Sequence, residues 1–346
     1  MTRFVSDSRL DHLRSLVDLP DLSATKYALL RRIARGGMGT VYLAEDRDLR
    51  RQVALKVLTV PDPSGHLVAR MLAEARIIAR LEHPAIVPIH DVGRLPDGRV
   101  YYTMKYVQGQ TFTDYLAGDP PLPDRLRLVQ QVCQAVAFAH SRNVVHRDLK
   151  PDNIMVGAFG EVLVMDWGVA KVLRDVAARA DEGTEDTVET PTSDGYVIGT
   201  LAFMSPEQAE GSVEDVDEQS DIYMAGATLY YALTGRAPFS GATPLELRKK
   251  IMEGGPPSPR QFNDRIARPL AAICLKATAR LKEKRYLRAE NMALDIGRFL
   301  TQEPVEAYPE NLFQKAGRWI AKNQFVVYLV VVYLIVRALI FFLLKR

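Results

Sequence analysis

The sequence predicts an α+β fold of two lobes, a small β-rich lobe before a larger helical lobe, followed by one apolar C-terminal segment. Three observations support this prediction. Residues 27–105 contain short stretches of alternating apolar and polar residues, separated by glycines and charged turns, which is typical of antiparallel strands. From Pro123 onward, apolar residues recur at helical spacing. The segment 325–344 is then almost entirely apolar.

The first lobe is expected to hold five strands and one helix. A polar lead of residues 1–26 precedes it, in which only a short helix around residues 10–17 fits the pattern. The helix is predicted over 66–83, and Pro84 follows its end. Apolar residues share one face of this helix, namely Leu67, Met71, Ala75 and Ile78. The strands are predicted at 27–34, 40–46, 52–58, 86–93 and 99–107.

The second lobe is expected to be mainly helical. Helices are predicted at 124–140, 217–234, 243–252, 268–279 and 289–301. The stretch 176–195 differs, because it carries six acidic and five hydroxyl residues and no aromatic residue. It has too little apolar surface to order itself, so we predict a long mobile loop within the second lobe.

Composition and charge restrict the class of protein. Of the 346 residues, 47% are hydrophobic and 25% are charged, which is near the average of folded globular proteins and excludes a disordered, collagen-like or polytopic membrane chain. A net charge of +3 lacks the strongly basic character of nucleic-acid-binding proteins, so we expect no nucleic-acid partner. Cys133 and Cys274 lie far apart, which excludes a disulfide framework or zinc ribbon and fits a reducing compartment.

A glycine-rich turn, residues 35–39, connects the first two predicted strands. Glycines let backbone N–H groups approach phosphate oxygens, although a flexible hairpin turn is an equal alternative. Neither a Rossmann nor a Walker A motif fits, because no helix and no Gly-Lys-Ser/Thr follows. Lys56 lies on the next strand and Glu74 on the following helix, with Glu82 as a competing acid. A Lys–Glu pair would fix the amine where it can hold phosphate.

The densest group of chemically active residues is the run His-Arg-Asp-Leu-Lys-Pro-Asp-Asn at 146–153. A second group, Asp166-Trp167-Gly168, follows a short apolar strand at 162–165. Asn153 and Asp166 offer the hard oxygen ligands that Mg²⁺ prefers.

These motifs, in this order, resemble the eukaryotic-like (Hanks-type) serine/threonine protein kinases of bacteria, over residues 27–300. The resemblance implies a bilobal protein-kinase fold that uses ATP and Mg²⁺ to phosphorylate protein substrates. It implies that Asp148 is the catalytic base and that Lys150 neutralises charge on the transferred group. It further implies that Asn153 and Asp166 hold Mg²⁺, and that Lys56, held by Glu74, contacts the α- and β-phosphates.

The resemblance also implies an adenine pocket. Met104 would lie at the entrance to this pocket, and residues 105–107 would form the hinge whose backbone meets the adenine edge. Ile33, Val41, Ala54 and Met155 would form its apolar walls; the alternative is that these four are simply core residues. The full set of implied ATP-binding residues is Ile33, Ala34, Arg35, Gly36, Gly37, Met38, Gly39, Thr40, Val41, Ala54, Lys56, Glu74, Met104, Tyr106 and Met155.

Specificity for serine and threonine follows from the same resemblance, because Lys150 stands two residues after Asp148 and Gly199-Thr200 precedes Ser205-Pro206-Glu207. Asp221 and Arg285 would brace the catalytic loop and Glu207. The expected autophosphorylation sites lie in the acidic stretch, and the candidates are Thr184, Thr187, Thr190, Thr192 and Ser193.

Two departures from the family pattern concern the glycine loop and the metal motif. Ala34 replaces the first glycine and Trp167 replaces a phenylalanine, but neither change removes a reacting group. The alternatives are a pseudokinase scaffold that binds nucleotide or a partner without transfer, and a small-molecule kinase on the same fold. Lys56, Asp148 and Asp166 are all present, which favours the active kinase.

The apolar segment 325–344 predicts one transmembrane helix, since a helix of this length spans about 30 Å, the thickness of a bilayer core. Lys315, Arg318 and Lys322 precede it, as expected for a cytoplasmic flank. Placing Arg337 in the bilayer would cost roughly 2.5–3.5 kcal/mol, which opposes insertion of this helix. The alternative is a helix that lies in the membrane–water interface.

The expected organisation is therefore a lead (1–26), a kinase domain (27–301, with lobes 27–105 and 108–301), a juxtamembrane segment (302–324) and a transmembrane helix (325–344), with the kinase domain in the cytoplasm at the cell membrane. Whether the chain forms a homodimer cannot be inferred from these patterns.

Overall fold

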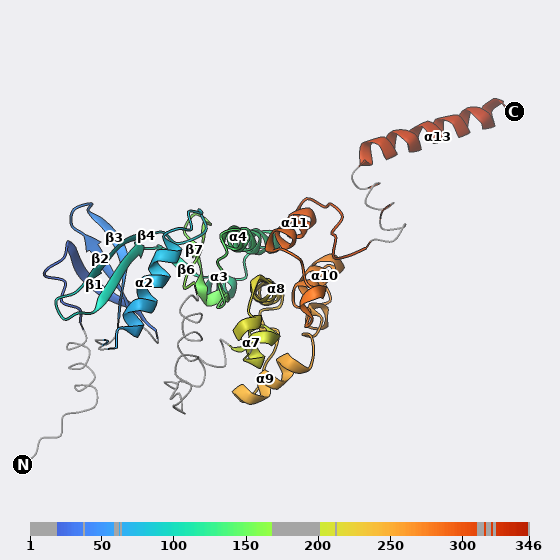
Figure 1. The fold of residues 1–346 in the computed structure, drawn as a ribbon. Helices are drawn as coiled ribbons and strands as arrows, with labels where there is room; N and C mark the ends of the chain where they lie inside the picture. Colours follow the sequence, from blue (N-terminus) through green and yellow to red (C-terminus); the bar gives the residue numbers. More distant parts are fainter. Residues whose placement is uncertain are drawn as a thin grey trace, which may run out of the picture.

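The computed structural model describes residues 19–36, 39–58, 62, 64–167, 201–211, 213–309, 315, 320 and 323–344. Within these residues a sheet lobe precedes a helical lobe, and the two lie side by side (Figure 1). The predicted bilobal α+β architecture is confirmed. The candidate phosphorylation sites and the predicted mobile loop at 176–195 lie outside the described residues.

The first lobe is a five-stranded antiparallel sheet in the order β1-β2-β3-β5-β4. Its elements are β1 (Tyr27–Arg35), β2 (Gly39–Asp46), β3 (Arg51–Leu58), α2 (His66–Ile78), β4 (Ile89–Arg94) and β5 (Val100–Lys105). The buried face of α2 presents Met71 and Ala75 to the same apolar cluster as Ala54 of β3 and Met104 of β5. Burial of these alternating apolar positions holds the helix on the sheet.

Helix α2 ends five residues earlier than the predicted end at residue 83. Arg80 N–H donates to Ile77 O at 3.1 Å and Leu81 N–H donates to Ile78 O at 2.9 Å, so the last turn tightens and stops. The next strand also begins later than predicted, because Ile86 pairs with Val164 of the second lobe instead of extending β4.

Residues 19–26 pack against the sheet lobe. Leu22 is 6% exposed and belongs to a core cluster with Tyr27 and Leu95, and Arg99 Nη2 donates to Leu19 O at 3.4 Å. The folded lobe therefore includes part of the polar lead.

The second lobe contains a small three-stranded sheet and several helices. Its elements are β6 (Gly109–Thr111), α3 (Phe112–Ala117), α4 (Leu122–His140), η1 (Pro151–Asn153), β7 (Ile154–Gly157), β8 (Val162–Val164), α7 (Pro206–Glu210), η2 (Val213–Asp215), α8 (Glu218–Thr234), α9 (Pro244–Glu253), η3 (Pro259–Gln261), α10 (Arg268–Ala277), η4 (Lys282–Lys284) and α11 (Ala289–Leu300). The predicted helices agree with α4, α8, α9, α10 and α11 to within two residues at each end.

Helix α8 is buried on nearly every side, and α4 and α10 pack against it (Figure 1). It begins at an N-cap aspartate, Asp217, whose side chain accepts the backbone N–H of Gln219 at 3.0 Å. At Gly226 a side-chain carbon would lie 2.6 Å from Ala277 Cβ, so glycine is required where α8 meets α10. Helix α8 is thus a fixed support for the loops around it.

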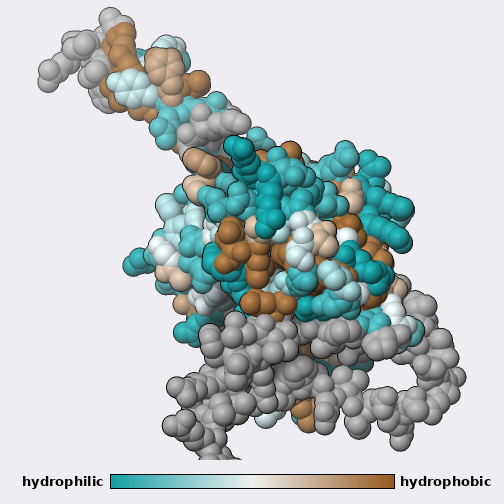
Figure 2. Space-filling view, turned by 90° about the vertical axis from the view of Figure 1, so that its left-hand side faces the viewer, coloured by the Kyte–Doolittle hydropathy of each residue, from teal (hydrophilic) through white to brown (hydrophobic). Residues whose placement is uncertain are grey.

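The chain after α11 turns back onto the second lobe. Buried Asp295 accepts the backbone N–H groups of Glu306 at 2.9 Å and Ala307 at 3.0 Å, and Val305 is 6% exposed. Beyond this stretch lies α13 (Gln324–Leu344), which covers the predicted apolar segment. Figure 1 draws α13 apart from the helical lobe, and Figure 2 shows brown apolar side chains gathered on it. Within the part of the chain that the structure describes, no helix meets the combined length and apolarity needed to cross a membrane.

Candidate active site

Lys56 of β3 contacts acidic residues from two other elements. Its Nζ lies 2.9 Å from Oε1 of Glu74 on α2 and 3.5 Å from Oδ1 of Asp166, which follows β8. The hydroxyl of Tyr102 on β5 donates to the same Glu74 oxygen at 2.8 Å. Because Glu74 is only 2% exposed, this contact holds its carboxylate in place for the lysine. The arrangement links both lobes through one ammonium group.

The protonation state of Lys56 follows from competing effects. Burial disfavours the ammonium form, but the neighbouring oxygens of Tyr102, Glu74 and Asp166 outweigh it and raise the pKa of Lys56 well above its ordinary value. Burial also raises the pKa of Tyr102. Lys56 is therefore a permanent cation at neutral pH, and Tyr102 keeps the proton that it donates to Glu74.

Asp148 presents a carboxylate that two other side chains orient. Lys150 Nζ lies 3.4 Å from its Oδ2, and Asn153 Nδ2 donates to the same oxygen at 3.1 Å and to Asp148 O at 2.7 Å. Lys150 and Asn153 are buried, whereas the Asp148 side chain is 24% exposed. A fixed, partly exposed carboxylate beside a lysine suits the removal of a proton from a substrate hydroxyl.

The backbone that carries Asp148 is held by Asp221 of α8. Its two carboxylate oxygens accept the backbone N–H of His146 at 2.7 Å and that of Arg147 at 2.8 Å. His140 also contacts Asp221 Oδ2 at 2.7 Å. Asp221 is fully buried, so these three contacts satisfy its charge.

His146 is buried as a neutral ring. Its Nε2 donates to the carbonyl of Met165 at 3.0 Å, which leaves Nδ1 to accept the backbone N–H of Asp148 at 3.2 Å. Burial lowers the pKa of His146, in agreement with this tautomer. Its ring lies 4.7 Å from that of Trp167, which is 1% exposed and part of the main core. Trp167 therefore packs inside the lobe and leaves Asp166 beside Lys56.

Asn153 and Asp166 fit a magnesium site. Asn153 donates from its Nδ2 to Asp148, so its Oδ1 is oriented away from that contact and can act as a metal ligand. The Asp166 side chain is 52% exposed and is therefore accessible to a metal ion. Met165 N–H donates to Asn153 O at 2.9 Å and keeps the two segments adjacent. Mg²⁺ is commonly held by one or two protein oxygens and completed by water and substrate phosphates. Among the residues that the structure describes, no group of three His, Cys, Asp or Glu side chains could hold a metal ion.

Some of the residues expected to line the adenine pocket lie together in the structure, and others do not. Ala54 pairs with Met104 across β3 and β5, and Val41 and Tyr106 pack against the same apolar cluster. Ile33 is 40% exposed on β1 and lies outside that cluster, and Met155 is half-buried on β7.

The described part of the glycine turn is closed by a hydrogen bond from Gly36 N–H to Gly39 O at 2.8 Å. Gly37 and Met38 lie outside the described residues. Arg35 pairs with Thr40 and Ala34 with Val41 across β1 and β2. Ala34 is not among the non-glycine residues with positive φ, so alanine is compatible with the backbone here.

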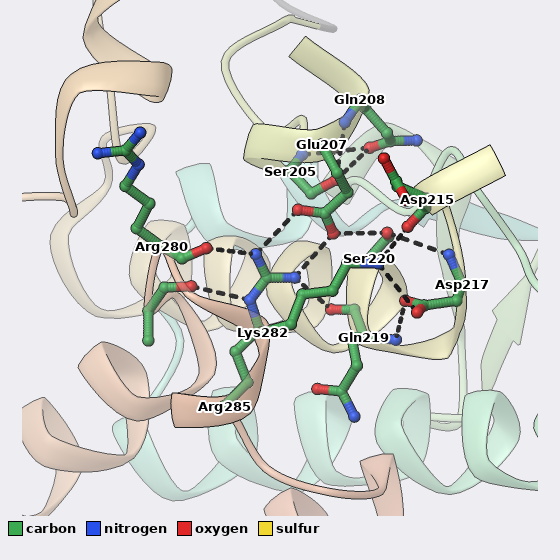
Figure 3. Close-up of polar contacts among 11 residues, drawn as sticks. Ser205, Glu207, Gln208, Asp215, Asp217, Gln219, Ser220, Arg280, Lys282 and Arg285 are labelled. Carbon is green, nitrogen blue, oxygen red and sulfur yellow. Dashed lines mark hydrogen bonds and ion pairs between the residues drawn. The ribbon is translucent and has the colours of Figure 1, made fainter. Parts of the chain in front are cut away.

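A buried ion pair anchors the segment after the predicted mobile loop. Arg285 Nη1 and Nη2 lie 2.8 and 2.9 Å from the two carboxylate oxygens of Glu207, and Ser220 Oγ donates to Glu207 Oε1 at 2.6 Å (Figure 3). Burial alone would raise the pKa of Glu207, but the bonds from Arg285 outweigh it and lower the pKa. Arg285 also donates to the carbonyls of Ala279, Gln219 and Arg280.

Sequence reasoning missed two polar residues of this site. Tyr102 supports Glu74, and Gln208 contacts the catalytic loop through Arg147 O at 2.7 Å. The Ser-x-x-Gln pattern at 205–208 is the signature of a helix capping box and could have drawn attention to Gln208. For Tyr102 the sequence offers only its place on a strand beside Lys56.

Comparisons with known proteins agree with this geometry. The protein kinase domain model matches residues 27–286. The chain is 38% identical over 296 residues to the serine/threonine-protein kinase PknB of Mycobacterium tuberculosis, covering 83% of this chain and 45% of that protein. It is 37% identical over 275 residues to the serine/threonine-protein kinase PrkC of Bacillus subtilis, covering 78% of this chain and 40% of that protein.

The chain thus spans less than half the length of these curated relatives. Among solved structures, the kinase domain of Mycobacterium tuberculosis PknI shares the fold, with a TM-score of 0.57 and 23% identity over 79% of this chain and 96% of that one. The extent of the family match, together with the Lys56–Glu74 pair and the Asp148 loop, shows that this chain belongs to the protein kinase family.

Proposed function

We propose that this chain is a serine/threonine protein kinase that transfers the γ-phosphoryl group of ATP to protein hydroxyls. The observation that carries the proposal is the convergence of Lys56, Glu74 and Asp166 across the two lobes. A pseudokinase scaffold would not need a lysine that is both held by a buried glutamate and placed beside a metal-binding aspartate.

Each residue has one role in this proposal. When bound, ATP supplies the phosphoryl group and Mg²⁺ neutralises phosphate charge. Lys56 holds the phosphate oxygens, and Asn153 and Asp166 offer the metal ligands. Asp148 accepts the proton of the attacking hydroxyl, while Lys150, at 3.4 Å, balances charge beside it.

Incubation of the full chain with radiolabelled ATP, Mg²⁺ and a generic protein substrate tests the activity. Acid hydrolysis should release labelled phosphoserine and phosphothreonine, and an Asp148→Asn chain is the matched control. Binding of nucleotide without any transfer by the unaltered chain would instead support the pseudokinase alternative. Label on phosphotyrosine alone would contradict the proposed specificity.

Autophosphorylation of the acidic stretch is a second part of the proposal. Arg147 precedes the catalytic aspartate, and its buried Nε has no hydrogen-bond partner among the described residues. A phosphothreonine could pair with such a guanidinium and order the segment around it. Among the candidate threonines, Thr190 and Thr192 are favoured over Thr184 and Thr187, because they lie nearer to Gly199-Thr200. Intact-mass analysis with and without phosphatase tests this, and an unmodified 169–205 peptide after incubation with ATP would contradict it.

We also propose that the C-terminal segment anchors the kinase at the cell membrane, with the catalytic domain in the cytoplasm. The proposal is supported by the apolar side chains that α13 exposes, such as Phe325 (74%) and Leu334 (54%), which would otherwise face water. The basic residues before it support the orientation. Alkaline carbonate should leave the full chain in membranes and release a chain that ends at Gln324. Equal retention or equal release of the two chains would contradict the anchor.

A further inference from the structure

Gln208 is the third residue of α7, and its side chain bridges two segments that lie far apart in the sequence. Its Oε1 accepts the backbone N–H of Ser205 at 3.1 Å, and its Nε2 donates to Arg147 O at 2.7 Å, 61 residues away. A backbone N–H can only donate and a carbonyl can only accept, so the two partners fix which end of the amide is which. Glutamine is required for this bridge, because it needs one acceptor and one donor.

The carbonyl that Gln208 contacts belongs to the peptide group directly before the proposed catalytic base. The N–H of that same peptide is the Asp148 N–H, which donates to His146 Nδ1 at 3.2 Å. Gln208 thus holds one end of the peptide and His146 holds the other. Together they set the rotation of the peptide from which the Asp148 side chain projects.

This peptide needs external support because Arg147 has an unfavourable backbone conformation. Its φ is 67°, in the left-handed region that non-glycine residues seldom adopt. Asp221 accepts the Arg147 N–H at 2.8 Å and fixes the preceding peptide. The Gln208 contact completes the support on the carbonyl side.

The other end of the bridge is tied to the anchored segment after the predicted mobile loop. Ser205 caps α7, and the neighbouring Glu207 is fixed by its buried pair with Arg285 (Figure 3). A displacement of α7 would therefore withdraw the amide from Arg147 O. The orientation of the Asp148 peptide then depends on where this segment lies.

We infer that Gln208 is a positioning residue that couples the placement of the 205–210 segment to the orientation of the catalytic base. The inference rests on the proposed kinase function. The competing explanation is that Gln208 only caps α7, since Ser-x-x-Gln is a common capping pattern. The two explanations differ in what happens when the cap stays and the Arg147 contact is lost.

Gln208→Glu separates them. Glutamate is also a capping-box residue, so it keeps an acceptor for Ser205 N–H, but at neutral pH it has no proton to donate to Arg147 O. Gln208→Met removes both contacts without adding charge. The control is Thr243→Val, which removes a side-chain cap from α9, where Thr243 Oγ1 accepts the Glu246 N–H at 3.2 Å.

The experiment measures kcat, KM for ATP and melting temperature of the full-length variants with a fixed protein substrate. We expect both Gln208 variants to lower kcat about tenfold with little change in KM for ATP, since Lys56 and Glu74 are untouched. All three variants should lower the melting temperature, Gln208→Glu because its carboxylate would face the Arg147 carbonyl oxygen, but Thr243→Val should do so without changing kcat.

Three results would decide against the inference or its basis. A Gln208→Glu chain with unchanged kcat would overturn it and leave only the cap. A loss of kcat in Gln208→Glu but not in Gln208→Met would also overturn it, because the added charge would then be the cause. An unaltered chain that transfers no phosphate would instead overturn the proposed function, which makes the two failures distinguishable.

Discussion

Replacing Arg285 with alanine tests whether the buried pair with Glu207 holds the second lobe together. Glu207 is 6% exposed, and the substitution removes the cation that its carboxylate binds. The donor that Figure 3 still draws to this carboxylate is Ser220 Oγ. It also removes the donors of three carbonyls, those of Ala279, Gln219 and Arg280. The cation further lies 5.0 Å from the centre of the Tyr223 ring, and this contact is lost as well.

The magnitude follows from the burial of the orphaned charge. Removing one partner of a buried ion pair costs about 3–5 kcal/mol, because the remaining charge stays out of water without compensation. For a lobe of this size, 1 kcal/mol corresponds to roughly 2–4 °C, so the melting temperature should fall by on the order of 10 °C. Removing Glu207 as well, in the double alanine variant, should recover part of the loss, since no buried charge is then left unpaired.

The Arg285–Glu207 pair should also change how the stability of the protein depends on pH. Arg285 lowers the pKa of Glu207 below its usual 4.5, so the pair contributes stability that is present above that value and is lost as the pH falls through the lower, folded-state pKa. In Arg285→Ala the orphaned carboxylate should instead have a raised pKa, so protonation relieves its burial. The stability gap between the two chains should therefore narrow toward acidic pH.

Thermal and urea unfolding of the full-length chain in one detergent, followed by circular dichroism from pH 4 to 8, provides the assay. A loss below about 1 kcal/mol at pH 7, the value of an exposed ion pair, would refute the reasoning. A stability gap that widens toward acidic pH would refute it too, because the orphaned carboxylate would then not be the cause.

Three further predictions concern single side chains. Asp148→Asn should abolish transfer but preserve ATP binding by calorimetry, since Asn cannot accept the proton; near-normal turnover would show that Asp148 is not the base. Lys56→Met should raise KM for ATP and lower kcat by removing the cation between Glu74 and Asp166, and unchanged steady-state kinetics would contradict that role. Asp295→Asn should cost about 2–3 kcal/mol of stability, because its NH₂ group would face one of the two backbone N–H groups that Asp295 now accepts; a melting temperature equal to that of the unaltered chain would contradict this.

Local patterns were sufficient for most elements of the fold. Alternation predicted the five strands of the first lobe, and helical spacing predicted α4, α8, α9, α10 and α11. Short elements were missed, such as β6, α3 and α7, because three to six residues contain too little periodicity. The predicted end of α2 was wrong because the helix closes with the tight backbone hydrogen bonds of Arg80 and Leu81, which the apolar pattern through residue 83 does not show.

Contacts between distant residues were the part that the sequence could not supply. The motif order predicted roles for Lys56, Asp148 and Asp166, which stay predictions, but nothing near Tyr102 in the sequence indicates that it contacts Glu74. The return of residues 305–307 to Asp295 was likewise hidden, since a lone aspartate on an amphipathic helix resembles a solvated residue. Burial and partners at this level depend on how the helices pack, not on local propensity.

The catalytic loop that carries Asp148 is held in place by side chains from two helices, α8 and α7. Asp221 can accept two adjacent backbone N–H groups only where its carboxylate is fixed and shielded from water, and α8 provides both conditions by being buried on nearly every side. That support comes from the permanent core. Gln208, in contrast, comes from the short helix α7, which the Arg285–Glu207 pair, Ser220 and the packing of Ala209 in a cluster with Leu247 of α9 hold in place. The catalytic loop is therefore supported both by the buried helix α8 and by the segment that follows the predicted mobile loop, so a shift of α7 alone would change the carbonyl side of this support while the Asp221 contacts stay.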